Sequence, residues 1–266
     1  MQQDKIKEFK ASLKKFIPKI RDAKEKNLNE ADTRMRIRVL LSEVLGYDFL
    51  EEITQEHMVQ GHYVDLTVKA PLWDKKVNKF RPTIVFFIEA KSIDTTLRDT
   101  HVYQATNYAA SGGVNLCLLT NGVDYRLYHL IWTKEKVEHS MIMSFNILDD
   151  EIDVVAEKLY LLSRESFKKG VIYRYITEKA SLSDKNLAQA LLSTRVLNAI
   201  RLELKNITGN NIKEDAVEVS LSKLIDPELY AFAKSCALKT SKKDKPLKQE
   251  PKIEQPQNVI NLESKG

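Results

Sequence analysis

The sequence predicts an α/β protein with a mixed sheet flanked by helices, and three observations indicate this class. Residues 29–145 change between helical and strand periodicity in the order helix, strand, strand, helix, strand, strand. Residues 83–91, "TIVFFIEAK", are apolar on both faces, as is typical of a central strand. Asn121 and Gly122 form a strong tight-turn signal between two apolar runs.

The chain begins with a lysine-rich amphipathic pattern. Residues 4–26 repeat apolar positions at helical spacing with lysines between them, and Pro18 predicts an interruption of this helix. We expect the helix to pack on the core with a solvated lysine face. A helix dedicated to DNA binding is the alternative.

A second helix is expected from about Asn29, a capping residue, to a stop at Gly46. Its residues Glu30, Arg34 and Arg38 share one stripe, because they are four positions apart.

The strands are expected next along the chain. In residues 62–68, "HYVDLTV", alternate residues face opposite sides, with Asp65 on the polar side. A polar linker, residues 70–82, then leads to the central strand. A helix over about residues 95–110 follows, and then the strands "VNLCLLT" and "VDYRLYHL" on either side of the tight turn.

The remaining residues divide the chain into further parts. Residues 149–238 are mostly helical in pattern and contain no catalytic motif, which favours a packing or protein-interaction module. Residues 239–266 are rich in Lys, Gln and Pro and are predicted to be disordered. The predicted organisation is an N-terminal basic helix in residues 1–28, an α/β domain in residues 29–148, the helical module and the tail.

Composition excludes several classes of protein. No window of the 266 residues is apolar enough for a membrane span and the first residues lack a secretory signal, so we expect a cytoplasmic protein. The two cysteines have neither disulfide-framework nor zinc-site spacing. The net charge of +5 comes from the ends, because residues 27–238 hold 26 basic and 29 acidic residues. Charge alone is therefore weak support for a DNA-binding core.

One group of residues carries chemistry. Glu89 and Lys91 lie two positions apart on a strand and therefore project from the same face. Asp65 can approach Glu89 if the two strands pair. Two carboxylates in an apolar setting repel each other unless a cation neutralises them, and oxygen ligands suit Mg²⁺ or Mn²⁺. Lys91 could stabilise developing negative charge or help to position an attacking water.

This Asp…Glu-x-Lys pattern resembles the PD-(D/E)XK nuclease superfamily, with Val64 in place of the proline. Five segments strengthen the resemblance, and in their order they look like the N-terminal nuclease domain of type I restriction enzyme R subunits. They are "NEADTRMRIRVLLSEVLGYD", "VDLTV", "FFIEAKS", "HVYQATNYA" and "LLTNGVDYRLY". The resemblance covers roughly residues 28–132 and implies a restriction-endonuclease-like fold. Helicase and Walker-type motifs are absent from the sequence, so it implies the nuclease without the motor.

The resemblance also implies roles for particular residues. Asp65 and Glu89 match the metal ligands, Lys91 the catalytic lysine, Glu30 the acidic residue of the first core helix, and Gln104 the glutamine that Tyr108 follows one turn later. The implied activity is Mg²⁺-dependent (possibly Mn²⁺-dependent) hydrolysis of DNA, in restriction or in defence against foreign DNA. The implied partners are DNA, a second copy of the chain, or other restriction or defence subunits.

Simpler interpretations stay open for each residue. Glu89 and Lys91 could form an ion pair at a sheet edge, and Glu30 could pair with Arg34 on its own helix. Gln104 and Tyr108 could pack near the site without a role, and Glu43, a rival to Glu30, is expected to face solvent. For the whole chain, the alternatives are a catalytically silent nuclease fold that binds nucleic acid or protein, and an interaction protein that works through its C-terminal helices and tail.

Overall fold

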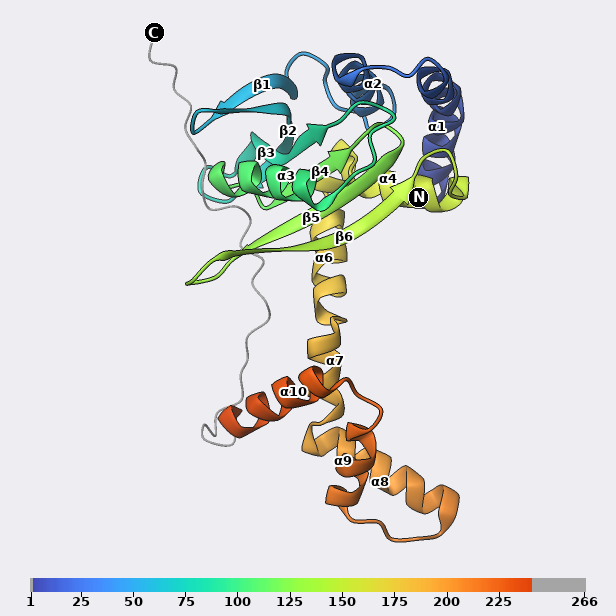
Figure 1. Ribbon diagram of the computed structural model, residues 1–266, viewed down its shortest axis with the longest axis vertical. Coiled ribbons are helices and arrows are strands. Elements are labelled where there is room, and N and C mark those ends of the chain that lie inside the picture. The colour runs from blue at the N-terminus through green and yellow to red at the C-terminus, as the bar shows by residue number, and fades with distance from the viewer. Residues whose placement is uncertain (1, 241–266) are drawn as a thin grey trace. The chain divides into compact units, whose positions relative to one another are not determined.

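The structure is a computed structural model that describes residues 2–240 (Figure 1). These residues divide into two compact units, residues 2–174 and residues 175–240. The first unit contains the sheet, and the second consists of helices.

The sheet has six strands whose spatial order equals their order in the chain. They are β1 (Ile53–Val59), β2 (His62–Asp74), β3 (Lys79–Ala90), β4 (Leu116–Thr120), β5 (Asp124–Trp132) and β6 (Val137–Asn146). Neighbouring strands are antiparallel except β3 and β4, which are parallel and connected by helix α3 (Asp99–Ser111). The predicted α/β class with a mixed sheet is confirmed.

Strand β3 lies inside the sheet, between β2 and β4, as its apolar sequence predicts. Residues 85–90 are all buried. The turn predicted at Asn121 and Gly122 is also confirmed, because β4 and β5 pair directly on either side of it. Gly122 has a φ of +83°, a conformation that glycine adopts without a steric penalty.

The predicted polar linker over residues 70–82 is wrong, because most of it belongs to the paired ends of β2 and β3. Pro71 lies opposite Pro82 there. Proline has no backbone N–H to donate to a neighbouring strand. Within the described residues no third strand pairs with this end of the hairpin, so the two prolines disrupt no further strand pairing. Strands β1 and β6 were not predicted either. Both lie at an edge of the sheet and expose much of their length, which obscures a strand pattern.

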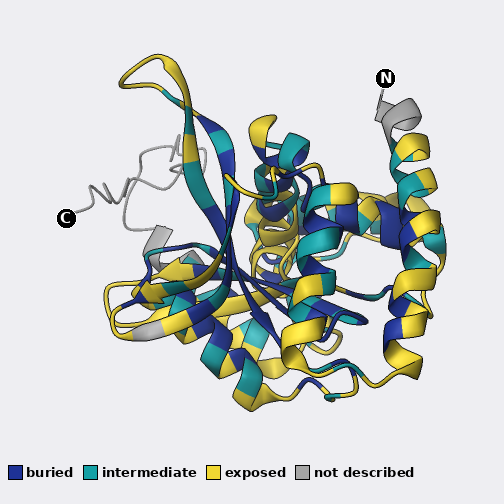
Figure 2. Cartoon of the chain, turned by 90° about the horizontal axis from the view of Figure 1, so that it is seen from above, coloured by how far each residue is buried: buried dark blue, intermediate teal, exposed yellow. Residues whose placement is uncertain are grey.

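Helix α1 (Gln2–Glu25) runs through Pro18, so the predicted interruption is wrong. Buried residues on both sides of Pro18, among them Phe16 and Ile20, hold the helix against the protein. This packing outweighs the hydrogen bond that proline cannot make. Figure 2 shows the helix at the N label, with a buried stripe on one side and an exposed opposite face.

Helix α2 (Glu30–Glu43) begins where the sequence predicts. The side chain of Asn29 accepts a hydrogen bond from the N–H of Asp32, which is the expected cap. Glu43 is exposed and pairs with Lys19 of α1, as expected of a solvent-facing residue.

Two further helices belong to the first unit. Helix α4 (Ile152–Leu161) packs against α1 and β6, and α5 (Arg164–Lys168) packs against β2. Nε of Arg164 donates to both carboxylate oxygens of the buried Glu52, at 2.8 and 2.7 Å. These contacts attach residues beyond 148 to the sheet unit, and the domain limits drawn from the sequence stay predictions.

The second unit has a small core of Ala188, Leu192 and Ala233. Helix α6 (Val171–Ser181) begins in the first unit and ends in the second. The other helices of the second unit are α7 (Asp184–Leu191), α8 (Thr194–Thr208), α9 (Glu214–Ser222) and α10 (Pro227–Thr240). Of the tail predicted to be disordered, residues 241–266 lie outside the described residues. In residues 2–240, no helix combines the length and the apolar character that a membrane span requires.

Candidate functional site

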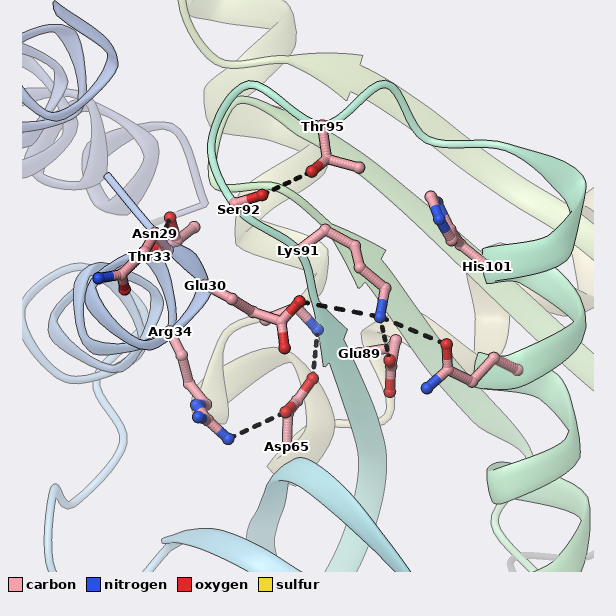
Figure 3. Close-up of polar contacts among 12 residues, drawn as sticks. Asn29, Glu30, Thr33, Arg34, Asp65, Glu89, Lys91, Ser92, Thr95 and His101 are labelled. Atoms are coloured by element: carbon pink, nitrogen blue, oxygen red, sulfur yellow. Dashed lines mark hydrogen bonds and ion pairs between the residues drawn. The ribbon is translucent and has the colours of Figure 1, made fainter. Parts of the chain in front are cut away.

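The candidate site lies where β3 and β4 end side by side. Ala90 pairs with Thr120 at the ends of these two parallel strands. The carboxyl ends of parallel strands are a common place for ligand sites, because the chain leaves the sheet there and polar groups can converge. Strand β2 and helices α2 and α3 contribute the other side chains, as Figure 3 shows.

Asp65 reaches the site from β2. One of its oxygens, Oδ2, accepts a hydrogen bond from the N–H of Ala90 at 2.8 Å. The other, Oδ1, accepts one from Arg34 of α2 at 3.0 Å. Burial raises the pKa of Asp65 above its ordinary value, although both donors act to lower it. The approach of Asp65 to the Glu89 strand, predicted from the sequence, is therefore confirmed.

Glu89 is the most buried charged residue of the site, with 4% of its surface exposed. Its Oε1 accepts a hydrogen bond from Nζ of Lys91 at 2.6 Å. Burial nevertheless raises the pKa of Glu89 from 4.5 to about 7, with smaller contributions from Asp65 and Glu30 in the same direction. One lysine therefore does not compensate for the loss of water around this carboxylate.

Lys91 stands at the centre of the group. Its N–H donates to the carbonyl of Thr120 at 2.9 Å, which fixes its backbone at the end of β4. Besides Glu89, its Nζ contacts Oε1 of Gln104 at 3.3 Å and a carboxylate oxygen of Glu30 at 4.0 Å. Burial alone lowers the pKa of Lys91, but the surrounding carboxylates outweigh it and raise that pKa, so the ammonium stays charged.

Gln104 is held in place through α3. Its Nε2 donates to the hydroxyl of Tyr108 at 3.2 Å, which leaves Oε1 directed at Lys91. The end of α3 approaches β3 closely, because a Cβ on Gly112 would lie 2.5 Å from a ring carbon of Phe87. A side chain there would push α3 and Gln104 away from the lysine. At the start of α3, His101 accepts a hydrogen bond from the N–H of Arg98.

The structure brings together all five residues proposed from the sequence, Glu30, Asp65, Glu89, Lys91 and Gln104. Their catalytic roles stay predictions. Arg34 was considered only as part of the α2 stripe and as a possible partner of Glu30, and its contact with Asp65 was missed. Its position four residues after Glu30 was the available signal, since both then lie on one face of α2.

The chemistry of these side chains fits a divalent cation. Three carboxylates, Glu30, Asp65 and Glu89, face two cationic side chains, Arg34 and Lys91. The exposed Glu56 also pairs with Arg34, at 3.7 Å, so with all groups ionised the negative charges outnumber the positive ones. Asp65 and Glu89 supply the hard oxygen atoms that Mg²⁺ and Mn²⁺ prefer. Among the described residues, however, no group of three or more His, Cys, Asp or Glu side chains is arranged to hold a metal ion. The candidate ligand set is therefore the pair Asp65 and Glu89.

The sheet order, the parallel β3–β4 pair and the position of this group can be compared with known proteins. Residues 29–143 match the family model of the type I restriction enzyme R protein N terminus. The match begins at the cap of α2 and ends within β6, so this R-protein-like domain contains the whole candidate site. It is consistent with a PD-(D/E)XK nuclease-like domain. No curated protein and no solved structure matches the chain.

Proposed function

We propose that the R-protein-like domain is a metal-dependent nuclease that hydrolyses phosphodiester bonds in DNA, in restriction or in defence against foreign DNA. The observation that carries this proposal is the convergence of Asp65, Glu89 and Lys91 at the end of β3. The family match supports the nuclease-like character of the domain.

Each residue has a definite task in this reaction. Asp65 and Glu89 would hold Mg²⁺ or Mn²⁺, which when bound polarises a phosphate and lowers the pKa of a water molecule. Lys91 provides a charged donor for the negative charge that develops on the phosphate oxygens. Gln104 positions Lys91 through its Oε1, and Glu30 adds a carboxylate that faces the ammonium. The buried β3 keeps these groups at fixed distances from one another.

A catalytically silent fold that binds nucleic acid or protein is the second candidate, and one observation favours it. Each proposed metal ligand already has a cationic partner within the protein, Arg34 for Asp65 and Lys91 for Glu89. A fold that had lost its metal could retain such pairs as structural contacts. The two candidates differ in whether a divalent cation displaces these partners.

The test is incubation of the purified protein with plasmid, linear duplex and single-stranded DNA, in Mg²⁺, in Mn²⁺ and in chelator. We expect cleavage only with metal, and its loss in Asp65→Asn and in Lys91→Met. Lys136→Met is the matched control, because Lys136 pairs with Glu138 on an exposed hairpin outside the site. Cleavage that persists in both site variants would overturn the assignment. DNA binding without cleavage under every condition would favour the silent fold.

The partners and location expected from the sequence stay proposals. DNA is the proposed substrate and other restriction or defence subunits are proposed partners, on the basis of the family match. A homodimer and a cytoplasmic location stay predictions.

A further inference from the structure

A second feature of the sheet unit is the free end of the β2–β3 hairpin, residues 69–84, here called the basic arm. In the described part of the chain, β1 pairs with β2 only as far as Val68, and β4 pairs with β3 only from Phe87. The basic arm is therefore a two-stranded ribbon beyond the six-stranded part of the sheet. One face of the ribbon is covered, because Ala70 and Leu72 are buried and α5 packs against β2. The exposed residues 75–80 at the tip are therefore the part that DNA can reach.

The charge of the basic arm differs from that of its surroundings. Residues 69–84 contain five Lys or Arg and one Asp, a net charge of +4. Residues 27–238 as a whole hold 26 basic and 29 acidic residues, a net charge of −3, so the remainder of that region carries −7. Lys75, Lys76 and Lys79 are all exposed at the tip. The basic arm is thus a positively charged segment in a region whose other residues carry a net negative charge.

The single acidic residue of the basic arm is engaged in building the turn. Asp74 accepts a hydrogen bond from the N–H of Lys76 at 2.8 Å and contacts the guanidinium of Arg81 at 3.4 Å. The hydrogen bond from Lys76 lowers the pKa of Asp74, with Arg81 acting in the same direction. Asp74 therefore stabilises the turn on which the lysines lie, and its negative charge is paired with the positive charge of Arg81.

Aromatic side chains stiffen the basic arm. Trp73 and Phe80 face each other across the two strands, with ring centroids 5.2 Å apart in an edge-to-face arrangement. They are 39% and 46% exposed. Lys168 of α5 lies over the Phe80 ring at 5.0 Å and adds another cation beside the arm. A preorganised ribbon loses little conformational entropy when it binds.

A second hairpin of the same sheet shows that a basic tip is not a general property of this chain. The β5–β6 connection carries Lys134 and Lys136 together with Glu135 and Glu138, which balance each other. It also exposes an aromatic side chain, Trp132. Of these two hairpins, only β2–β3 therefore has an excess of lysine at its tip.

We propose that the basic arm binds the phosphate backbone of duplex DNA and holds it for the candidate site. This inference rests on the proposed DNA substrate. Ten residues of β3 separate Lys79 from Glu89, which corresponds to roughly 33 Å along a strand. One turn of B-form DNA is about 34–36 Å long. The arm and the site are thus spaced so that one duplex can contact both, about one helical turn apart.

The test compares two double variants that each remove two exposed lysines from a hairpin tip. The arm variant is Lys75→Ser with Lys76→Ser, and the matched control is Lys134→Ser with Lys136→Ser. The affinity of the full-length protein for a fluorescent duplex of about three helical turns is measured by anisotropy, in chelator and over a range of salt concentrations. Thermal unfolding shows whether both variants remain folded.

We expect the arm variant to bind the duplex about tenfold more weakly or worse at low salt, because each lysine–phosphate contact releases condensed counterions. The slope of log affinity against log salt should decrease in magnitude by about two, and the control should resemble the wild type. Equal affinities and slopes for the two double variants would overturn the proposal. So would an effect confined to single-stranded DNA.

Cleavage assays on the same proteins separate this inference from the proposed function. If the wild type cleaves DNA with Mg²⁺ and the arm variant binds as well as the control, the arm proposal fails and the nuclease stands. If the arm variant loses affinity for the duplex and none of the proteins cleaves DNA, the arm proposal stands and the proposal of nuclease activity is rejected.

Discussion

Replacing Glu89 by Gln is expected to stabilise the metal-free protein at neutral and alkaline pH. Glu89 is buried, and the loss of solvation destabilises its ionised form by more than the hydrogen bond from Lys91 stabilises it. The pKa of Glu89 is therefore raised from 4.5 to about 7. The folded protein then holds a proton that the unfolded chain releases as the pH rises. The stability associated with this group is present below about pH 4.5 and is lost as the pH rises through about 7. Gln, which is always neutral, avoids that loss.

The size of the effect follows from the pKa values. At roughly 1.4 kcal/mol for each pKa unit, a rise from 4.5 to about 7 corresponds to about 3 kcal/mol between acid and alkaline pH. At low pH, Glu89 is protonated and resembles Gln, so the two proteins should have similar free energies of unfolding. At about pH 8, Glu89→Gln should be more stable by close to the full amount.

The assay is urea unfolding in chelator at several values between about pH 4.5 and pH 8, for the wild type and Glu89→Gln. Glu138→Gln is the control, because Glu138 forms an exposed ion pair with Lys136 and such pairs contribute little. A constant difference between wild type and Glu89→Gln would refute the reasoning. The reasoning would also be refuted if the free energy of unfolding of the wild type increased relative to that of the variant as the pH rises. Glu89 would then be ionised and stabilised by Lys91.

Two further substitutions test the packing and the electrostatics of the site. Gly112→Ala should lower the free energy of unfolding by about 1–3 kcal/mol, because its Cβ would lie 2.5 Å from the Phe87 ring, whereas Ser111→Ala at the neighbouring exposed position should have little effect in the same urea experiment. Arg34→Met should destabilise the protein in chelator, because Asp65 loses one donor, yet Mg²⁺ should raise its melting temperature more than that of the wild type. A smaller Mg²⁺-dependent rise in the variant would show that Arg34 does not compete with the cation.

Local periodicity was sufficient for the central part of the sheet. The run that ends at Glu89 is apolar on both faces, and only the middle of a sheet buries both faces of a strand. The period of two placed Asp65 on the polar side of the preceding strand. Once these strands pair, the carboxylates must converge, which is why the core of the candidate site could be proposed from the sequence.

Edge strands could not be recognised in this way. Strands β1 and β6 expose much of their length. Exposed positions do not require apolar residues, so their sequences lack the alternation of apolar and polar residues that marks a half-buried strand. The ends of β2 and β3 contain two prolines and several lysines, which locally favour a linker. Pairing across the hairpin, with Trp73 against Phe80, outweighs those local preferences.

The sequence by itself determined the fold class, the central strand and the residue types that meet at its end, because these depend on periodicity within short segments. The tertiary structure decided which charges become partners. On α2 the sequence allowed Glu30 to pair with Arg34, but the structure directs Glu30 towards Lys91 and Arg34 towards Asp65. Such choices, like the raised pKa of Glu89, depend on the distances between separate elements and on the exclusion of water, and neither is set within one segment of the chain.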